Sequence, residues 1–91
     1  MKPTGNELID HCIKKHLADD ETVLLADDLE NAFMGIGRQF HYPIAIYSYK
    51  KAIKILMRDH KMDREEAEEY FQFNIAGAFV GDQTPVFLQD E

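Results

Sequence analysis

Four basic residues follow one another at spacings of three, four and three: Lys51, Lys54, Arg58 and Lys61. On a helix this spacing predicts a basic ridge, which would hold an anion, a nucleic acid or an acidic partner. Residues 48–61 contain five Lys or Arg and one Asp, a net charge of +4, whereas residues 62–91 contain one Arg and eight acids, a net charge of −7. The alternative, and the more common case, is a solvated helix face that the acids of the next helix partly neutralise.

Two groups of acidic residues suggest a different chemistry, in which carboxylates imitate the phosphate spacing of a nucleic acid. The acids ahead of the predicted hairpin are Asp19, Asp20, Glu21, Asp27, Asp28 and Glu30, and those of the third predicted helix include Glu65, Glu66, Glu68 and Glu69. Such residues more often keep a small protein soluble. They also lack the spacing of a calcium-binding loop.

The residues typical of metal sites and active sites give weaker signals. Cys12 and His16 stand four apart, which fits half a metal site, but there is one cysteine in the chain and a structural zinc site needs paired ligands. We therefore expect Cys12 to be a buried apolar residue and expect no metal ion. Gly35 and Gly37 lack the third glycine of a dinucleotide fingerprint, and no phosphate-binding loop or nucleophile elbow occurs. We expect no cofactor and no enzyme activity.

The elements in the first half of the chain follow from hydrophobic spacing. Residues 6–17 predict a helix with Asn6 as its N-cap. Residues 22–25 fit either a short buried strand or the entry to the next element. The stretch 27–40 begins like a helix, but Gly35 and Gly37 alternate with Met34, Ile36 and Arg38, and this alternation favours a strand. With a turn at His41-Tyr42-Pro43 and a return strand over 44–47, it predicts a hairpin.

The second half predicts two helices and a strand. A helix begins after the N-cap Ser48 and carries the basic ridge, with Ile53, Leu56 and Met57 on its apolar face. A third helix, with Asp63 and Glu66 as a capping box, extends from Arg64 to about Val80. Its apolar stripe is too wide for a surface helix, so we expect it at the centre of the core. A final strand over 84–88 has its proline at the first residue or at a sheet edge.

Five residues of the third helix are assigned structural roles: Phe71, Asn74, Ile75, Gly77 and Phe79. We expect the three large apolar side chains to pack on the second helix and on the strands. Asn74 is expected to bond a neighbouring backbone group, because an unpaired buried amide costs about 1 to 3 kcal/mol. Gly77 suggests close approach of another backbone or the beginning of the helix end.

Composition predicts one soluble domain, residues 1–91, of the α+β class: three helices packed on a small antiparallel sheet made of the hairpin and the C-terminal strand. The net charge is −7, 45% of the residues are hydrophobic, and a single cysteine rules out an internal disulfide. Extra support would come from self-association as a homodimer. We expect no signal peptide, no membrane span and a cytoplasmic location, and the charge disfavours nucleic acid as a partner.

The segment EEAEEYFQFNIAGAFVG at residues 65–81, followed by TPVF at 84–87, resembles a pattern in small uncharacterised proteins of bacteriophages and prophages. The likeness extends less distinctly back through residues 44–47 and the second helix, and covers about half the chain. It implies a phage origin and a location in the cytoplasm of a bacterial host, but no activity. Together with the aromatic content, it predicts a phage accessory protein that binds another protein, with nucleic-acid binding through the basic ridge, or acidic mimicry, as alternatives.

Overall fold

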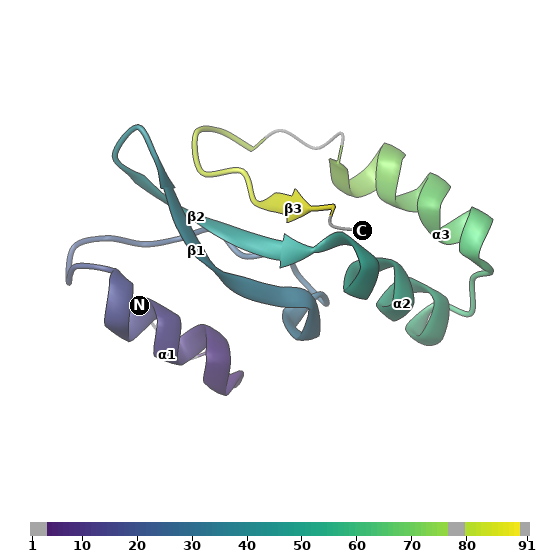
Figure 1. Ribbon diagram of the computed structural model, residues 1–91, viewed down its shortest axis with the longest axis horizontal. Helices are drawn as coiled ribbons and strands as arrows, with labels where there is room; N and C mark the ends of the chain where they lie inside the picture. Colours follow the sequence, from purple (N-terminus) through teal and green to yellow (C-terminus); the bar gives the residue numbers. More distant parts are fainter. Residues whose placement is uncertain (1–3, 77–79, 90–91) are drawn as a thin grey trace.

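The computed structural model describes residues 4–76 and 80–89, which form three helices and a three-stranded sheet in an elongated molecule of 41 × 26 × 24 Å. The elements follow in the order α1 (Glu7–His16), η1 (a 3-10 turn, Glu30–Ala32), β1 (Phe33–Gln39), β2 (Tyr42–Ser48), α2 (Tyr49–Asp59), α3 (Arg64–Tyr70), η2 (a π-helical segment, Phe71–Ala76) and β3 (Val86–Leu88). Figure 1 shows α1 at one end of the sheet and the α2–α3 pair at the other. The predicted α+β layout is confirmed.

One strand pairing differs from the prediction of an antiparallel sheet. The strand order is β1-β2-β3, and β1 and β2 form the expected antiparallel hairpin, but β3 runs parallel to β2. The reason is visible in Figure 1: α2 continues in the direction of β2, and α3 leads the chain back along the sheet. The chain therefore re-enters the sheet from the end at which β2 begins. A parallel pair needs such a crossover connection.

Local capping explains where the helices begin. The side chain of Asn6 accepts from the Ile9 N–H, and that of Ser48 accepts from the Lys51 N–H. Asp63 and Glu66 form a complete capping box at the start of α3. These three predicted caps are confirmed, and each satisfies a backbone donor that the first turn of a helix leaves unpaired.

Two predicted boundaries are wrong. The hairpin turn lies at Phe40 and His41, so Tyr42 and Pro43 belong to β2. The proline is tolerated because β3 pairs only with the last three residues of β2, and Pro43 needs no N–H on that side. The third helix stops being α-helical at Tyr70 and continues as η2. Gly77 and Phe79 lie outside the described residues, and residues 22–25, whose type the sequence left open, form no strand or helix.

The core lies on one face of the sheet, which we call the packed face. Its largest fully buried side chains are Tyr47, Phe71 and Ile9. Aromatic rings join the sheet to the helices in a continuous series, Phe33–Tyr47–Phe87–Phe71–Tyr49, with centroid separations of 4.8 to 5.6 Å. Offset and edge contacts of this kind stabilise a core beyond the apolar area they bury.

As far as the structure describes it, the predicted third helix lies at the core only in part. Ala67 is the buried residue of α3, whereas the middle strand β2 buries most of its length. Phe71 and Ile75 do pack on the core, but Met57 of α2, expected there, is 37% exposed. The wide apolar stripe of the sequence includes Phe73, which is 80% exposed. The π-helical turn rotates successive side chains differently from an α-helix, so an α-helical reading of the stripe misplaces them.

Candidate functional site: an apolar hollow with an acidic rim

The predicted basic ridge lies on the exposed side of α2. Lys51, Lys54 and Arg58 are exposed, on the side of the helix opposite to the buried Ala52, Ile53 and Leu56. Lys61 is exposed too but follows the end of the helix, with a backbone φ of 53°. The structure therefore brings three of the four ridge residues together.

Arg58 has an acidic partner on its own helix. Its Nε donates to Asp59 Oδ1 at 2.8 Å, an ion pair that raises the pKa of Arg58 and lowers the pKa of Asp59. The charge of the ridge is thus reduced at this position. Among the described residues, the ion pair made by α3 is internal, between Arg64 and Glu68, so the acids of α3 do not neutralise Lys51 and Lys54 by direct pairing.

A hollow of about 440 Å³ lies on the other side of α2, between four segments of the chain. Its apolar lining consists mainly of Leu25, Leu29, Leu56, Ile75, Pro85 and Phe87. Leu29 and Leu56 are almost fully buried, whereas Leu25, Ile75 and Phe87 are half-buried and present apolar surface to the hollow. A concave, mainly apolar surface of this size is typical of a binding site.

The polar residues of the hollow are Asp27, Asp28, His60, Tyr70, Asn74 and Thr84. A second, more polar depression of about 370 Å³ adjoins it, shares Asp28 and His60, and adds Glu30, Asp59 and Arg58. Four carboxylates, together with Arg58 and His60, thus border the two depressions. We call Asp27, Asp28, Glu30 and Asp59 the acidic rim.

The loop that carries two of these acids is fixed to the core by one hydrogen bond. The Ala26 N–H donates to the hydroxyl oxygen of Tyr47 at 2.8 Å. Burial raises the pKa of the Tyr47 hydroxyl, which therefore stays neutral. Asp28 has a backbone φ of 65°, a left-handed conformation that Asp adopts more readily than most residues. The tight turn at 27–28 directs the chain from the hollow into η1.

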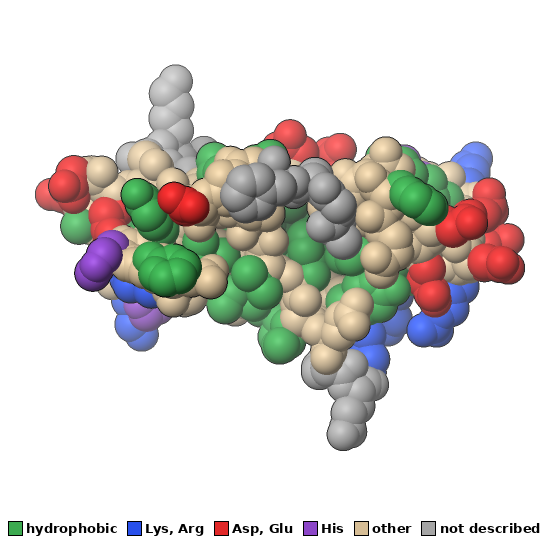
Figure 2. All heavy atoms as spheres, turned by 90° about the horizontal axis from the view of Figure 1, so that it is seen from above, with side chains coloured by type: hydrophobic (Ala, Val, Ile, Leu, Met, Phe, Trp, Pro, Cys, Tyr) green, Lys and Arg blue, Asp and Glu red, His purple; other side chains and the backbone are tan. Residues whose placement is uncertain are grey.

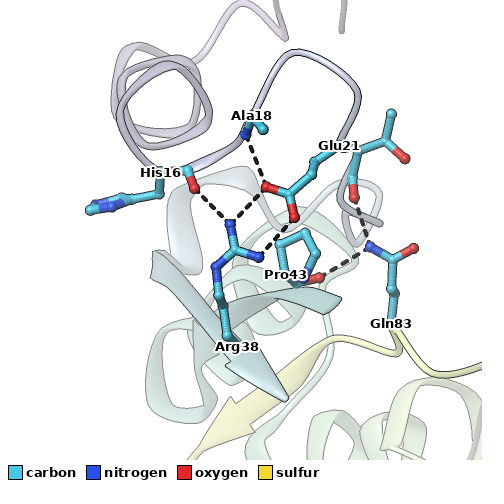
Figure 3. A network of polar contacts seen from close by, with 7 residues as sticks. His16, Ala18, Glu21, Arg38, Pro43 and Gln83 are labelled. Atoms are coloured by element: carbon cyan, nitrogen blue, oxygen red, sulfur yellow. Dashed lines mark hydrogen bonds and ion pairs between the residues drawn. The ribbon is translucent and has the colours of Figure 1, made fainter. Parts of the chain in front are cut away.

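The opposite wall, residues 80–87, is held by side chains with backbone partners. Gln83 Nε2 donates to the carbonyl oxygens of Thr22 at 2.7 Å and Pro43 at 3.2 Å, which ties this wall to the loop after α1 and to β2 (Figure 3). Thr84 Oγ1 accepts from the Val80 N–H and donates to the Gly81 carbonyl oxygen at 2.6 Å. Both walls are therefore fixed by contacts with the sheet or within their own turn.

The third wall is the π-helical segment η2 and the end of α3. Asn74 Nδ2 donates to the Tyr70 carbonyl oxygen at 3.2 Å, a backbone contact of the kind expected for it, but its side chain is exposed instead of buried. The Tyr70 ring stacks on His60 with centroids 6.3 Å apart. Short π-helical turns often occur at functional sites. Here the segment carries Asn74 and Ile75 to the hollow while Phe71 stays in the core.

The arrangement offers an apolar concave surface with polar groups at its border, which is suited to binding. The hydroxyl of Thr84 is engaged with the Gly81 carbonyl. Cys12 is buried in α1, as expected, with 8% of its surface exposed. In residues 4–76 and 80–89, no three His, Cys, Asp or Glu side chains gather in a way that would hold a metal ion.

Sequence reasoning missed the hollow because its lining is scattered. In the sequence, residues 22–25 and 27–40 are ambiguous and residues 81–88 predict a turn and a strand, and none of these stretches contains a motif. The one local signal is the pair Asp27-Asp28, which stands between the apolar residues Leu25-Ala26 and Leu29. Only the fold brings this pair to Ile75 and Phe87.

No family model, curated protein or solved structure matches the chain. The structure is that of an α+β domain with an acid-rimmed apolar hollow. None of the helices in the described part of the chain is long and apolar enough to cross a bilayer.

Proposed function

We propose that this domain is a small phage-type accessory protein that works in the cytoplasm of a bacterial host by binding another protein. The acid-rimmed hollow is the observation that carries this proposal. It would take a large apolar side chain of the partner, flanked by Lys or Arg residues that face the acidic rim. The likeness of residues 65–87 to phage proteins supports the biological setting.

The dimensions of the hollow favour a protein segment as the ligand. A volume of about 440 Å³ holds roughly one or two large side chains. Apolar anchors that fill a pocket at the centre of an interface supply most of the binding energy, and the surrounding polar contacts supply specificity. The half-buried Leu25, Ile75 and Phe87 provide the apolar surface, and their packing on the core keeps it preformed.

Charge determines which segment fits. The chain has a net charge of −7, and Asp27, Asp28 and Glu30 stand exposed on one loop and turn beside the hollow. This field attracts a basic segment and speeds its association, while an acidic segment is repelled. The expected ligand is therefore a peptide segment with a central Leu or Phe between lysines or arginines.

Three peptides of about twelve residues would test this proposal: one with Phe between lysines, one with that Phe replaced by Ser, and one with the lysines replaced by glutamates. We expect the first alone to shift the backbone amide resonances of Asp28, Ile75 and Phe87. Its affinity should fall with added salt, because the rim contacts are exposed. Equal binding of all three peptides would contradict the proposal.

A pair of protein variants sharpens the test. Asp27→Asn together with Asp28→Asn should weaken the lysine-flanked peptide about tenfold. The matched control, Glu65→Gln together with Glu69→Gln, changes the net charge equally on the exposed side of α3 and should leave affinity within about twofold. Equal losses in the two variants would indicate attraction to the overall charge and no defined site.

The basic ridge gives the alternative outcome. Lys51 and Lys54 are exposed on one side of α2, so a short DNA or RNA duplex should be tried with the same protein. Binding to nucleic acid would show a steep salt dependence that diminishes by about one unit for each lysine replaced by alanine. Such a result, without peptide binding, would assign function to the ridge and not to the hollow.

A further inference from the structure

The sheet has a second face, opposite to the packed face, and none of the described strand residues whose register places them on it is charged. The strand register places alternate residues there: Gly35, Gly37 and Gln39 of β1, Tyr42, Ile44, Ile46 and Ser48 of β2, and Val86 and Leu88 of β3. We call this the open face. In a chain in which 30% of the residues are charged, nine positions without Asp, Glu, Lys or Arg form an unusual surface.

Several apolar side chains of the open face remain exposed. Val86 is 46% exposed, Leu88 and Tyr42 are each 45% exposed, and Ile46 is partly exposed. The buried cluster formed with α1 and α2 includes Ala45 and Tyr47 of β2 and omits Ile44 and Ile46. Ile44 is itself only 3% exposed, so the exposed apolar surface of the open face lies at Tyr42, Ile46, Val86 and Leu88. Figure 2 shows hydrophobic side chains along the middle of the molecule and most of the charged ones toward its two ends.

The open face has both a recess and raised side chains. An added Cβ at Gly35 would meet nothing within 4 Å, so the sheet is empty above this residue. Beside it, a depression of about 340 Å³ is lined by Gly37, Arg38, Gln39, Ile44, Ile46 and Val86. The guanidinium group of Arg38 is engaged with Glu21 and the His16 carbonyl oxygen. The exposed Val86 and Leu88 stand next to this depression. A two-fold interface uses the same patch on both partners, so the patch must supply both the recess and the group that fills it.

We infer that a second copy of this chain packs on the open face, sheet against sheet, to form a homodimer. Charge selects this occupant. A partner attracted by the net charge of −7 would bring basic residues, and these would find no carboxylate on this face. Two acidic copies, in contrast, repel each other least where both are uncharged. Face-to-face packing of sheets at about 10 Å is a common way to bury such a surface.

The size of the face sets the strength of the dimer. Three strands are about 14 Å wide, and seven residues are about 23 Å long. This footprint is smaller than the roughly 800 Å² that each partner contributes to a standard stable interface. We therefore expect a dimer that dissociates on dilution, with a dissociation constant on the order of 0.1 mM.

Sedimentation equilibrium of the full chain over about 10 µM to 1 mM tests the inference. The wild type should shift from monomer to dimer across this range. Gly35→Lys adds a charge where the structure has open space and the backbone φ is not left-handed, so the monomer should fold normally. Its dissociation constant should rise at least tenfold, because the isologous contact places the new charge at the interface on both partners. Val86→Lys provides a second variant on the same face, in β3.

Phe73→Lys is the matched control. It makes the same change of charge at a residue that is 80% exposed on η2, away from the open face, and should leave dimerisation unchanged. Circular dichroism confirms that each variant is folded. A wild type that stays monomeric at about 1 mM would overturn the inference. So would a dimer that survives both lysine substitutions on the open face, or one that only Phe73→Lys disrupts.

Discussion

The two faces of the sheet are built from alternate residues of the same three strands, yet they differ in almost every physical respect. The packed face carries Phe33, Ala45, Tyr47 and Phe87 and holds the helices and the loop after α1. The open face carries two glycines and half-exposed aliphatic residues. Because strand side chains alternate between faces, one seven-residue strand can serve the core with one half of its residues and an external surface with the other.

The difference teaches that burial along β3 follows the face on which a residue lies more closely than its hydrophobicity. Val86 and Leu88 are as apolar as Phe87 but lie on the other face and stay nearly half exposed. Phe87 lies 5.4 Å from the Tyr47 ring and 4.8 Å from the Phe71 ring. The free energy of unfolding should therefore depend mainly on the packed face. Substitutions on the packed face and on the open face compare their contributions.

The largest effect is expected where the packed face meets η2. Phe71 is 2% exposed and contacts the rings of Tyr49 and Phe87, so Phe71→Ala should lower the free energy of unfolding by about 3 to 5 kcal/mol. Urea denaturation followed by circular dichroism measures this. The control, Phe73→Ala, alters a residue of the same segment that is 80% exposed, and should change stability by less than about 0.5 kcal/mol. Equal effects would mean that η2 does not anchor on the sheet through Phe71.

Two tyrosines on opposite faces of β2 provide the next comparison. Tyr47→Phe removes the hydroxyl that accepts from the Ala26 N–H and should cost about 1 to 3 kcal/mol, since that donor loses its partner. Tyr42→Phe, on the open face at 45% exposure, should cost less than about 0.5 kcal/mol. Denaturant melts give both values. Hydrogen exchange at Ala26 should also quicken in Tyr47→Phe alone, and an unchanged exchange rate would contradict the assigned bond.

The two glycines of β1 probe the open face itself. Gly35→Ala meets open space and should stabilise the monomer by about 0.5 to 1 kcal/mol, because alanine loses less backbone freedom on folding. At Gly37 a new Cβ would lie 2.9 Å from Ile46 Cδ1, so the end of that flexible side chain must move. Gly37→Ala should therefore be less stable than Gly35→Ala. Thermal melts at about 5 µM, where dimerisation is minimal, compare them, and the reverse order would place the free space at Gly37.

The smallest effect concerns the edge of the packed face, where Arg38 binds Glu21 with two hydrogen bonds of 2.7 and 2.8 Å and also donates to the His16 carbonyl oxygen (Figure 3). The Arg38 bonds, with one from the Ala18 N–H, lower the pKa of Glu21 from 4.5 to about 2. Folding is therefore favoured by this carboxylate above pH 4.5, and the contribution is lost as pH falls toward 2.

The melting temperatures of the wild type and Glu21→Gln measure this contribution. The wild type should melt higher at pH 7, and the two should converge as the pH falls from about 4.5 to about 2. Comparing the variants at each pH removes the effect of the other carboxylates. A difference that stays constant over this range would show that the Glu21–Arg38 pair adds no pH-dependent stability.

Much of the fold could be predicted from local sequence. Asn6, Ser48 and Asp63 cap their helices as their side-chain chemistry predicts, and the alternation around Gly35 and Gly37 predicted β1. Local patterns could not give the direction of β3, because a three-residue strand carries no information about its partner. Nor could they show the change from α to π geometry after Tyr70, which depends on how Phe71 packs between Tyr49 and Phe87.

The sites were less predictable than the fold. Lys51, Lys54 and Arg58 do share one side of α2, since helical spacing alone determines this. The hollow needs Leu25, Asp28, Ile75 and Phe87, which are separated by up to about sixty residues and meet only through the sheet pairing. The alternation of side chains along β2 implies two faces with different residues. The sequence could not indicate which of the two sets of residues would face the helices.

The parallel pairing of β3 with β2 has a kinetic consequence. Ser48 and Leu88 are partners in the sheet, so this contact closes a chain segment of roughly forty residues, whereas the hairpin closes one of a few residues. Contacts between distant residues slow folding, and we expect β3 to join the sheet after the hairpin and the two following helices have formed. Phe87 and Pro85 reach the hollow with β3. A nascent or partly folded chain would then lack one wall of the hollow, and binding competence would arise with the last step of folding.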